Sequence, residues 1–182
     1  KITMPENYIA LLTTPTAGEA AEIIRQAVKL SGVRAVVALG WGQQEAKTKD
    51  ANIFYVKSVP HDWLFPHMAG AVHHGGAGTT ATSLRHALPT LVVPFGGDQP
   101  FWAERVYAAG CGPKAIPRDK LTAENLAEGL RALISNPEYT RNAACIGEAL
   151  RNEHGCANAA DLIEKAVWDW ENGNPAQDVM NI

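Results

Sequence analysis

The chain has 182 residues, of which 46% are hydrophobic and 19% are charged. This length suits one compact domain with a sizeable core, and the composition excludes a disordered protein. The formal net charge of -3 argues against a nucleic-acid-binding protein, because such proteins gather Lys and Arg on one surface.

The sequence carries no sign of a metal site, a disulfide framework or a membrane span. Its three cysteines are scattered and form no CxxC pair. No apolar run approaches the ~18 residues that a transmembrane helix needs, and no signal peptide is recognisable. We therefore expect a cytoplasmic protein with reduced thiols, no bound metal and no transmembrane segment.

Short apolar runs alternate with helical patterns along the chain. Continuous apolar runs favour buried parallel strands, and apolar residues at intervals of three and four favour helices. Gly110 suits the end of a helix, and Thr122 suits a helix start without a full capping box. The predicted strands are 8–12, 33–39, 52–56, 69–72, 90–93 and 114–116, and the predicted helices are 18–30, 79–86, 99–109, 122–135, 138–153 and 156–170.

This alternation predicts βαβ units and a Rossmann-like α/β fold, with a parallel sheet between two layers of helices. Ligands of such open sheets bind outside the carboxyl ends of the strands. Four loops rich in Gly, Pro or His follow predicted strands and should open at that edge. They are 40–42, 58–61, 73–78 and 94–99.

The loop from His73 to Thr80, with the sequence HHGGAGTT, joins a strand to a helix. Its glycines allow close approach of the backbone, and the free N–H groups of a helix N-terminus favour an anion. His74 and the threonine hydroxyls could donate further hydrogen bonds to a diphosphate. The spacing matches neither a Walker loop nor a dinucleotide fingerprint. The alternative is a tight turn whose glycines serve packing alone.

Two neighbouring loops offer polar groups of other kinds. Asp98 and Gln99 suit adjacent sugar hydroxyls, although Asp98 is equally suited to cap the following helix. The backbone of Ser58 and Val59 could pair with a base edge. The alternative for this second loop is an ordinary connection, with Asp62 capping a short helix and the next residue, a tryptophan, in the core.

These loops, in this order, resemble the C-terminal donor-binding domain of GT-B glycosyltransferases. The strings VPHDWLF at 59–65, HHGGAGTT at 73–80 and PFGGDQPFW at 94–102 are similar to motifs of the UDP-sugar-dependent sterol and antibiotic glycosyltransferases. The resemblance implies a single nucleotide-sugar-binding domain over 1–182, corresponding to the C-terminal half of the GT-B fold. It implies transfer of a hexose from a UDP- or dTDP-sugar to a hydroxyl of a lipid-like or polyketide-like acceptor, with no cofactor or metal.

The resemblance also assigns roles to residues. It places the donor diphosphate on a set of four (His74, Gly76, Gly78 and Thr79), the base on Ser58 and Val59, and the sugar on Asp98 and Gln99. Trp41 and Gly42 would border the donor cleft. The catalytic base and the acceptor pocket would belong to an N-terminal domain, onto which the helix and tail at 156–182 would dock. No catalytic residue is then expected in this chain, and a lipid acceptor would bring the enzyme to a membrane surface.

Three hypotheses follow for the whole protein. The chain is the donor half of a two-domain glycosyltransferase, inactive by itself. Alternatively it is the donor-binding subunit of a transferase completed by a second chain, or a nucleotide-binding module without catalysis.

Overall fold

The computed structural model describes residues 8–12, 19–38 and 50–173. Contacts divide the chain into two compact units, Lys1–Leu150 and Arg151–Ile182. The described strands are β1 (Tyr8–Leu12), β2 (Arg34–Ala38), β3 (Ile53–Val56), β4 (Gly70–His73) and β5 (Thr90–Val92). The described helices are α1 (Glu19–Ser31), α2 (His61–Leu64), α3 (Ala77–Arg85), α4 (Gln99–Ala108), α5 (Ala123–Ser135), α6 (Pro137–Asn152) and α7 (Gly155–Glu171), with 3-10 turns η1 (Phe65–His67) and η2 (Arg118–Lys120).

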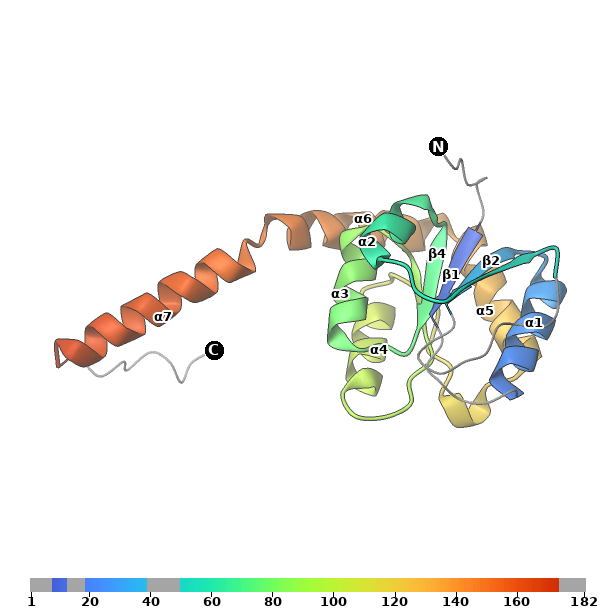
Figure 1. Ribbon diagram of the computed structural model, residues 1–182, viewed down its shortest axis with the longest axis horizontal. Helices are drawn as coiled ribbons and strands as arrows, with labels where there is room; N and C mark the ends of the chain where they lie inside the picture. The colour runs from blue at the N-terminus through green and yellow to red at the C-terminus, as the bar shows by residue number, and fades with distance from the viewer. Residues whose placement is uncertain (1–7, 13–18, 39–49, 174–182) are drawn as a thin grey trace. The chain divides into compact units, whose positions relative to one another are not determined.

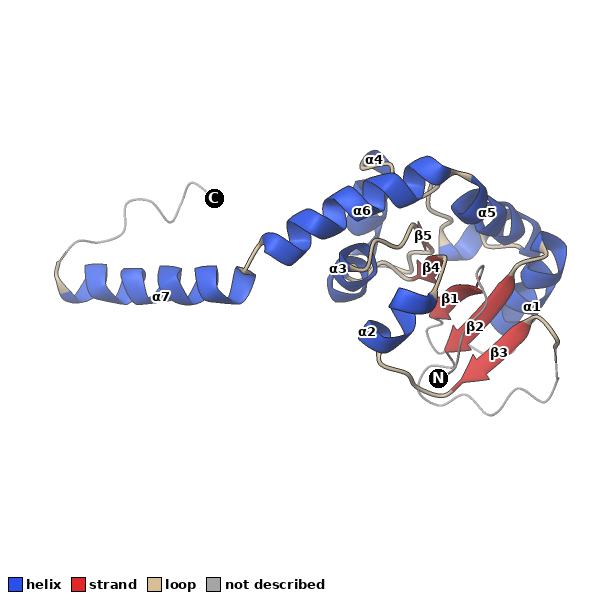
Figure 2. Ribbon diagram, turned by 90° about the horizontal axis from the view of Figure 1, so that it is seen from above, coloured by secondary structure: helices blue, strands red, loops and turns tan. Residues whose placement is uncertain are grey.

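The five strands of the first unit form one parallel sheet in the order β3-β2-β1-β4-β5 (Figure 1; all five are labelled in Figure 2). Alternate residues of a strand face opposite sides of a sheet, and here both sides are buried. In β1, Ile9 and Leu11 join one hydrophobic cluster, whereas Ala10 between them joins another. Such strands need helices on both faces, which the alternating chain provides.

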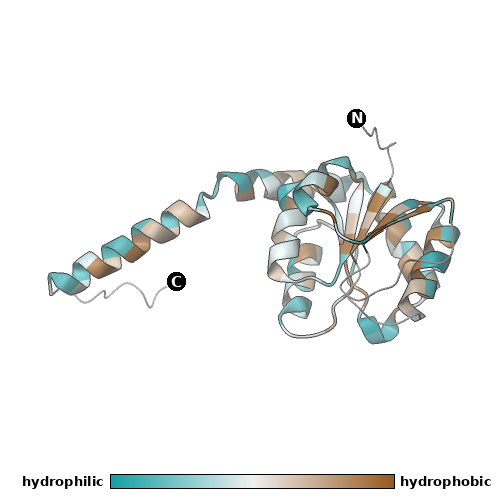
Figure 3. Cartoon of the chain, in the orientation of Figure 1, coloured by the Kyte–Doolittle hydropathy of each residue, from teal (hydrophilic) through white to brown (hydrophobic). Residues whose placement is uncertain are grey.

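The two helical layers lie on opposite faces of the sheet, as both ribbon views show (Figures 1 and 2). On one face, α1 and α5 bury residues such as Val28 and Leu130 against the strands. On the other face, Leu64 and Phe65 pack under β1 and β2, and α3 and α4 cover β5. Hydrophobic residues follow the strands and the inner helix faces (Figure 3). The predicted Rossmann-like three-layer fold is confirmed.

Local signals explain several helix ends. Gly110 ends α4 with φ +63, a conformation that glycine adopts without strain, as predicted. Thr122 begins α5 with a complete capping box, because the Asn125 side chain accepts from the Thr122 N–H and the Thr122 hydroxyl accepts from the Asn125 N–H. The prediction of an incomplete box was therefore wrong, since asparagine does here what glutamate or glutamine usually does.

The predicted strand at 114–116 is also wrong. This segment runs beside the end of β5 and is joined to it by isolated backbone hydrogen bonds, from Ile116 N–H to the Val92 carbonyl at 3.0 Å and from Arg118 N–H to the Pro94 carbonyl at 3.1 Å. Prolines at 113 and 117 flank the segment and have no N–H to donate, so a regular ladder cannot extend in either direction.

The second unit contains α7, whose residues are mostly exposed. Apolar residues recur at helical spacing and form one stripe along the helix. Its largest members are well exposed, with 65% for Ile163, 52% for Val167 and 81% for Trp170. Among the described residues, no helix is both long and apolar enough to cross a membrane.

Candidate functional site

The site candidates gather at the carboxyl edge of the sheet. The chain builds outward from β1 to β2 and β3, and then returns to place β4 on the other side of β1. The edge beside β1 and β4 is therefore the topological switch point, where open α/β sheets bind ligands. The turn after β4 lies at this point. Trp41 and Gly42, which were expected to border the cleft, lie outside the described residues.

The turn after β4 opens directly into a helix N-terminus. Gly76 is the N-cap of α3, and no side chain caps the helix. The N–H groups of residues 77–79 precede the first intrahelical bond, from Thr80 N–H to the Gly76 carbonyl at 2.9 Å. Gly75 has φ +90, and a Cβ there would lie 2.5 Å from Val92 Cγ1. Position 75 therefore requires glycine, both because of its positive φ and because a Cβ would clash with Val92.

His74 lies over the start of α3. A Cβ on Gly76 would lie 2.6 Å from His74 Nε2, so the ring rests against the Gly76 backbone. His74 is half-buried and lines a pocket at the carboxyl edge. Gly78 is exposed, with nothing within 4 Å of its Cβ position, and Thr79 is half-buried. The four predicted diphosphate residues are thus all found around one helix terminus.

The preceding histidine has a different environment. His73 is 1% exposed and bonds to Ser83 and to the backbone of Gly75. Burial, and to a lesser extent the neighbouring His74 and His61, lowers the pKa of His73 to about 3. His73 is therefore neutral at physiological pH and belongs to the support of the turn.

The loop between β5 and α4 packs against the glycine turn. A Cβ on Gly75 would lie 3.3 Å from the Gln99 carbonyl oxygen. The Gln99 side-chain oxygen accepts from the N–H groups of Phe95 and Gly96 at 2.7 and 3.3 Å. Both lone pairs of this oxygen are then used, so only the NH₂ group of the Gln99 side chain remains to make further hydrogen bonds.

Asp98 stands at the N-cap position of α4, but its carboxylate makes no capping bond. Its Oδ2 atom accepts instead from the indole N–H of Trp102 at 2.9 Å. The capping alternative for the Asp98 side chain is therefore wrong. The Asp98 carboxylate is exposed, and the bond to Trp102 holds it through Oδ2.

The loop after β3 leads into α2, which is anchored by Leu64 and the following Phe65. Ser58 is exposed, and Val59 is half-buried against the same cluster. The expected capping of α2 by Asp62 is wrong, since the N-cap is Pro60 and no side chain caps the helix.

The expectation that Trp63 lies in the core is also wrong, because this side chain is 50% exposed. The buried positions of the segment are the next two residues, Leu64 and Phe65. A helical turn over His61–Leu64 carries the neighbouring tryptophan to the outer side.

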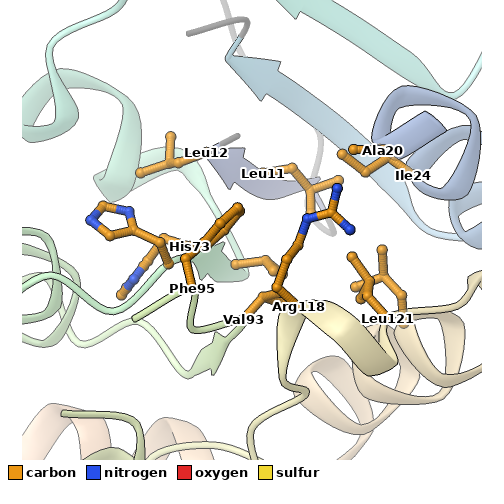
Figure 4. A pocket seen from close by; sticks show the side chains of 12 residues that line it. Leu11, Leu12, Ala20, Ile24, His73, Val93, Phe95, Arg118 and Leu121 are labelled. Atoms are coloured by element: carbon orange, nitrogen blue, oxygen red, sulfur yellow. The ribbon is translucent and has the colours of Figure 1, made fainter. Parts of the chain in front are cut away.

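A cationic residue that the sequence pattern does not single out also lines the pocket. Arg118 comes from η2 and places its guanidinium 5.7 Å from the centre of the Phe95 ring. Figure 4 shows the Arg118 side chain reaching toward Leu11 at the end of β1. The pocket wall is otherwise largely apolar, and it includes His74. The only local signal at Arg118 is a proline followed by a basic residue, which is too common to indicate a site.

The structure therefore brings together the loops after β4 and β5, with Arg118 at the same pocket. The loop after β3 lies three strand positions away from β4, which is roughly 14 Å at the usual spacing. Only an extended ligand can touch both ends of this edge. Within the described part of the chain, no cluster of three or more His, Cys, Asp or Glu has the geometry of a metal site.

The chain matches known proteins over most of its length. Residues 21–164 match the family model of the erythromycin biosynthesis protein CIII-like C-terminal domain. A sterol 3-beta-glucosyltransferase of Arabidopsis thaliana is 42% identical over 165 residues, which cover 88% of this chain and 27% of the relative. One from Pichia angusta is 38% identical over 151 residues, covering 80% of this chain and 12% of the relative. The chain thus spans well under half the length of these relatives.

Solved structures show the same architecture. The calicheamicin glycosyltransferase CalG4 superposes with a TM-score of 0.75 at 20% identity, over 88% of this chain and 43% of that chain. The glycosyltransferase VinC, solved in complex with dTDP, gives a TM-score of 0.68 at 26% identity, over 81% of this chain and 38% of that chain. With a family match over residues 21–164, the chain belongs to the erythromycin biosynthesis protein CIII-like C-terminal domain family, and it has the fold of the C-terminal domain of GT-B glycosyltransferases.

Proposed function

We propose that this chain binds the nucleotide-sugar donor of a hexosyltransferase that uses UDP- or dTDP-sugars. The observation that carries the proposal is the uncapped N-terminus of α3 at the switch point, with the His74 ring resting on Gly76. Free N–H groups and the helix dipole favour a diphosphate there. Arg118 adds a positive charge at the same pocket. VinC, a relative in fold, was solved with dTDP.

The other loops supply the remaining parts of the site. The backbone around Ser58 and Val59 would contact the base, roughly 14 Å along the edge from the turn. Asp98 and Gln99 would bind sugar hydroxyls, since one side chain offers a carboxylate oxygen and the other an NH₂ group. An extended nucleotide sugar would lie across the edge, with its diphosphate at His74, Gly76, Gly78 and Thr79.

In the proposed reaction, the acceptor oxygen bonds to the anomeric carbon while the bond from that carbon to the diphosphate oxygen breaks. The acceptor loses its proton to a general base, and negative charge develops on the departing diphosphate. The helix terminus, His74 and Arg118 would stabilise that charge. The base would come from an N-terminal acceptor-binding domain or subunit, and the acceptor would be a lipid-like or polyketide-like hydroxyl. A cytoplasmic location stays a prediction.

The apolar stripe of α7 supports such a partner. Ile163, Val167 and Trp170 are large apolar residues on one side of the helix, and they are exposed in this chain. Large exposed apolar surfaces usually mark interaction sites. We infer that the segment 156–182 packs on the N-terminal domain of the whole protein.

Calorimetry of UDP and dTDP binding to the chain tests the donor role. Both should bind, and His74→Ala should weaken binding by about 1–2 kcal/mol because it removes a charge-assisted hydrogen bond. His67→Ala, at an exposed histidine in η1, is the matched control and should bind like the native chain. Absence of binding by the folded native chain would refute the proposal.

A transferase assay distinguishes the three hypotheses for the whole protein. The purified chain with a UDP-sugar and a sterol acceptor should form no glycoside. Activity that returns with upstream residues of the same polypeptide supports a two-domain enzyme, whereas activity that returns with a second chain supports a two-chain transferase. Binding without activity in either case leaves a nucleotide-binding module.

A further inference from the structure

His73 is a buried polar residue beside the proposed diphosphate site. It ends β4, directly before the turn, and is 1% exposed. Its two ring nitrogens each have a partner. The Gly75 N–H donates to Nδ1 at 3.0 Å, and Nε2 lies 3.2 Å from the Ser83 hydroxyl on α3. His73 therefore connects the strand, the turn and the helix that follows it.

These partners determine where the ring carries its proton. A backbone N–H can only donate, so Nδ1 must be unprotonated and Nε2 must hold the hydrogen. The contact at Nε2 fits the same tautomer, because the Ser83 hydroxyl donates to the Thr80 carbonyl at 3.0 Å and can accept from Nε2. The Thr90 hydroxyl also lies within bonding distance of Ser83, at 3.2 Å. The network is consistent with one tautomer alone.

The same hydrogen bonds fix the backbone conformation of the turn. The bond from the Gly75 N–H to His73 Nδ1 accompanies a left-handed backbone conformation at Gly75, with φ +90. The next residue, Gly76, is the N-cap of α3 and lies against His74. A change at His73 Nδ1 would therefore move the backbone that presents the proposed diphosphate site.

We propose that His73 is a positioning residue for donor binding, which as a neutral Nε2–H imidazole holds the Gly75–Gly76 turn in its anion-binding conformation. This inference rests on the proposed donor role of the turn. His73 does not hydrogen-bond to the ligand itself, since both of its ring nitrogens are used within the protein.

Two variants at position 73 test whether the acceptor at Nδ1 matters for donor binding. In His73→Asn the side-chain oxygen replaces Nδ1 as the acceptor for Gly75, whereas His73→Leu keeps the apolar bulk and removes the acceptor. We expect His73→Asn to bind UDP within about threefold of the native affinity and His73→Leu to lose about tenfold, the usual effect of one lost hydrogen bond. Equal affinities for the native chain and a folded His73→Leu variant would overturn the proposal.

A control separates positioning from general loss of stability. Leu133 is 1% exposed on α5 and lies near Gly70 at the opposite end of β4 from His73. Leu133→Ala should lower the melting temperature without weakening UDP binding. If Leu133→Ala weakens binding as much as His73→Leu at a similar loss of stability, the effect is structural and the proposal fails.

Nitrogen-15 NMR of the native chain tests the tautomer without any ligand or variant. His73 should show a protonated Nε2 and an unprotonated Nδ1 across pH 5 to pH 7. A proton on Nδ1 would overturn the proposal even if UDP binds. Failure of the native chain to bind UDP and dTDP, with the expected tautomer present, would instead refute the donor role and with it the positioning role.

Discussion

The buried imidazole of His73 makes the stability of the chain depend on pH in a defined direction. Burial lowers its pKa in the folded chain to about 3, whereas the same side chain has a pKa of 6.5 when unperturbed. Between these values the unfolded chain takes up a proton that the folded chain excludes. The free energy of unfolding must therefore fall as the pH falls through this window.

The size of the effect follows from the two pKa values. At about pH 5 the imidazole of the unfolded chain is almost fully protonated, and at about pH 7 only about a quarter of it is. Integrating the proton difference gives a loss of about 2 kcal/mol between about pH 7 and about pH 5. Domains have net stabilities of roughly 5–15 kcal/mol, so the loss is measurable.

Urea unfolding of the native chain and of His73→Asn at several pH values measures this contribution of His73 to the free energy of unfolding. Asparagine does not titrate, and the other histidines are common to both proteins, so their contributions cancel. The native chain should lose about 2 kcal/mol relative to the variant on going from about pH 7 to about pH 5. Parallel pH profiles for the two proteins would refute the account of His73 as a buried neutral group.

Three further predictions concern other parts of the chain. Gly76→Ala should displace the His74 ring, because the new Cβ would lie 2.6 Å from His74 Nε2, and it should weaken UDP binding by about 1 kcal/mol. Gly155→Ala, where a Cβ would meet open space, should not change the affinity measured by calorimetry. Arg118→Gln should weaken UDP binding by about 1–2 kcal/mol and reduce its dependence on salt; equal loss in Lys114→Gln, at an exposed lysine, would show only a general charge effect. Thr122→Ala should lower the free energy of unfolding by about 1 kcal/mol, because it removes the cap of α5, and an unchanged urea midpoint would contradict this.

The fold was largely predictable because hydrophobic patterning suffices for this architecture. The apolar runs at 33–39 and 90–93 contain β2 and β5, and Gly110 ends α4 as expected. The error at 114–116 has a local cause. These three residues have the pattern of a strand, but the prolines on either side have no N–H to donate and prevent a regular ladder of hydrogen bonds. Pattern alone also does not show that Asn125 completes a capping box.

The site was predictable only to the level of its loops. The glycine turn and the loop of Asp98 and Gln99 follow adjacent strands, so their proximity follows from topology. The hydrogen-bond partner of each side chain does not follow from topology. Trp102 takes the Asp98 carboxylate, and Arg118 reaches the pocket only because the chain after β5 returns along that strand. Such contacts depend on tertiary packing, which a linear pattern does not encode.

The orientation of Gln99 gives the proposed sugar site a direction. Its oxygen is saturated by the N–H groups of Phe95 and Gly96, so this side chain can only donate to a ligand, whereas the neighbouring Asp98 carboxylate can only accept. A sugar bound across both would donate one hydroxyl hydrogen to Asp98 and accept a hydrogen bond from Gln99 on another hydroxyl oxygen. A donor that lacks one of these hydroxyls would leave a polar group of the protein without a partner, and sites of this kind reject such analogues strongly. Because the Gln99 oxygen is occupied within the protein, the proposed site would require one sugar hydroxyl that donates and one that accepts.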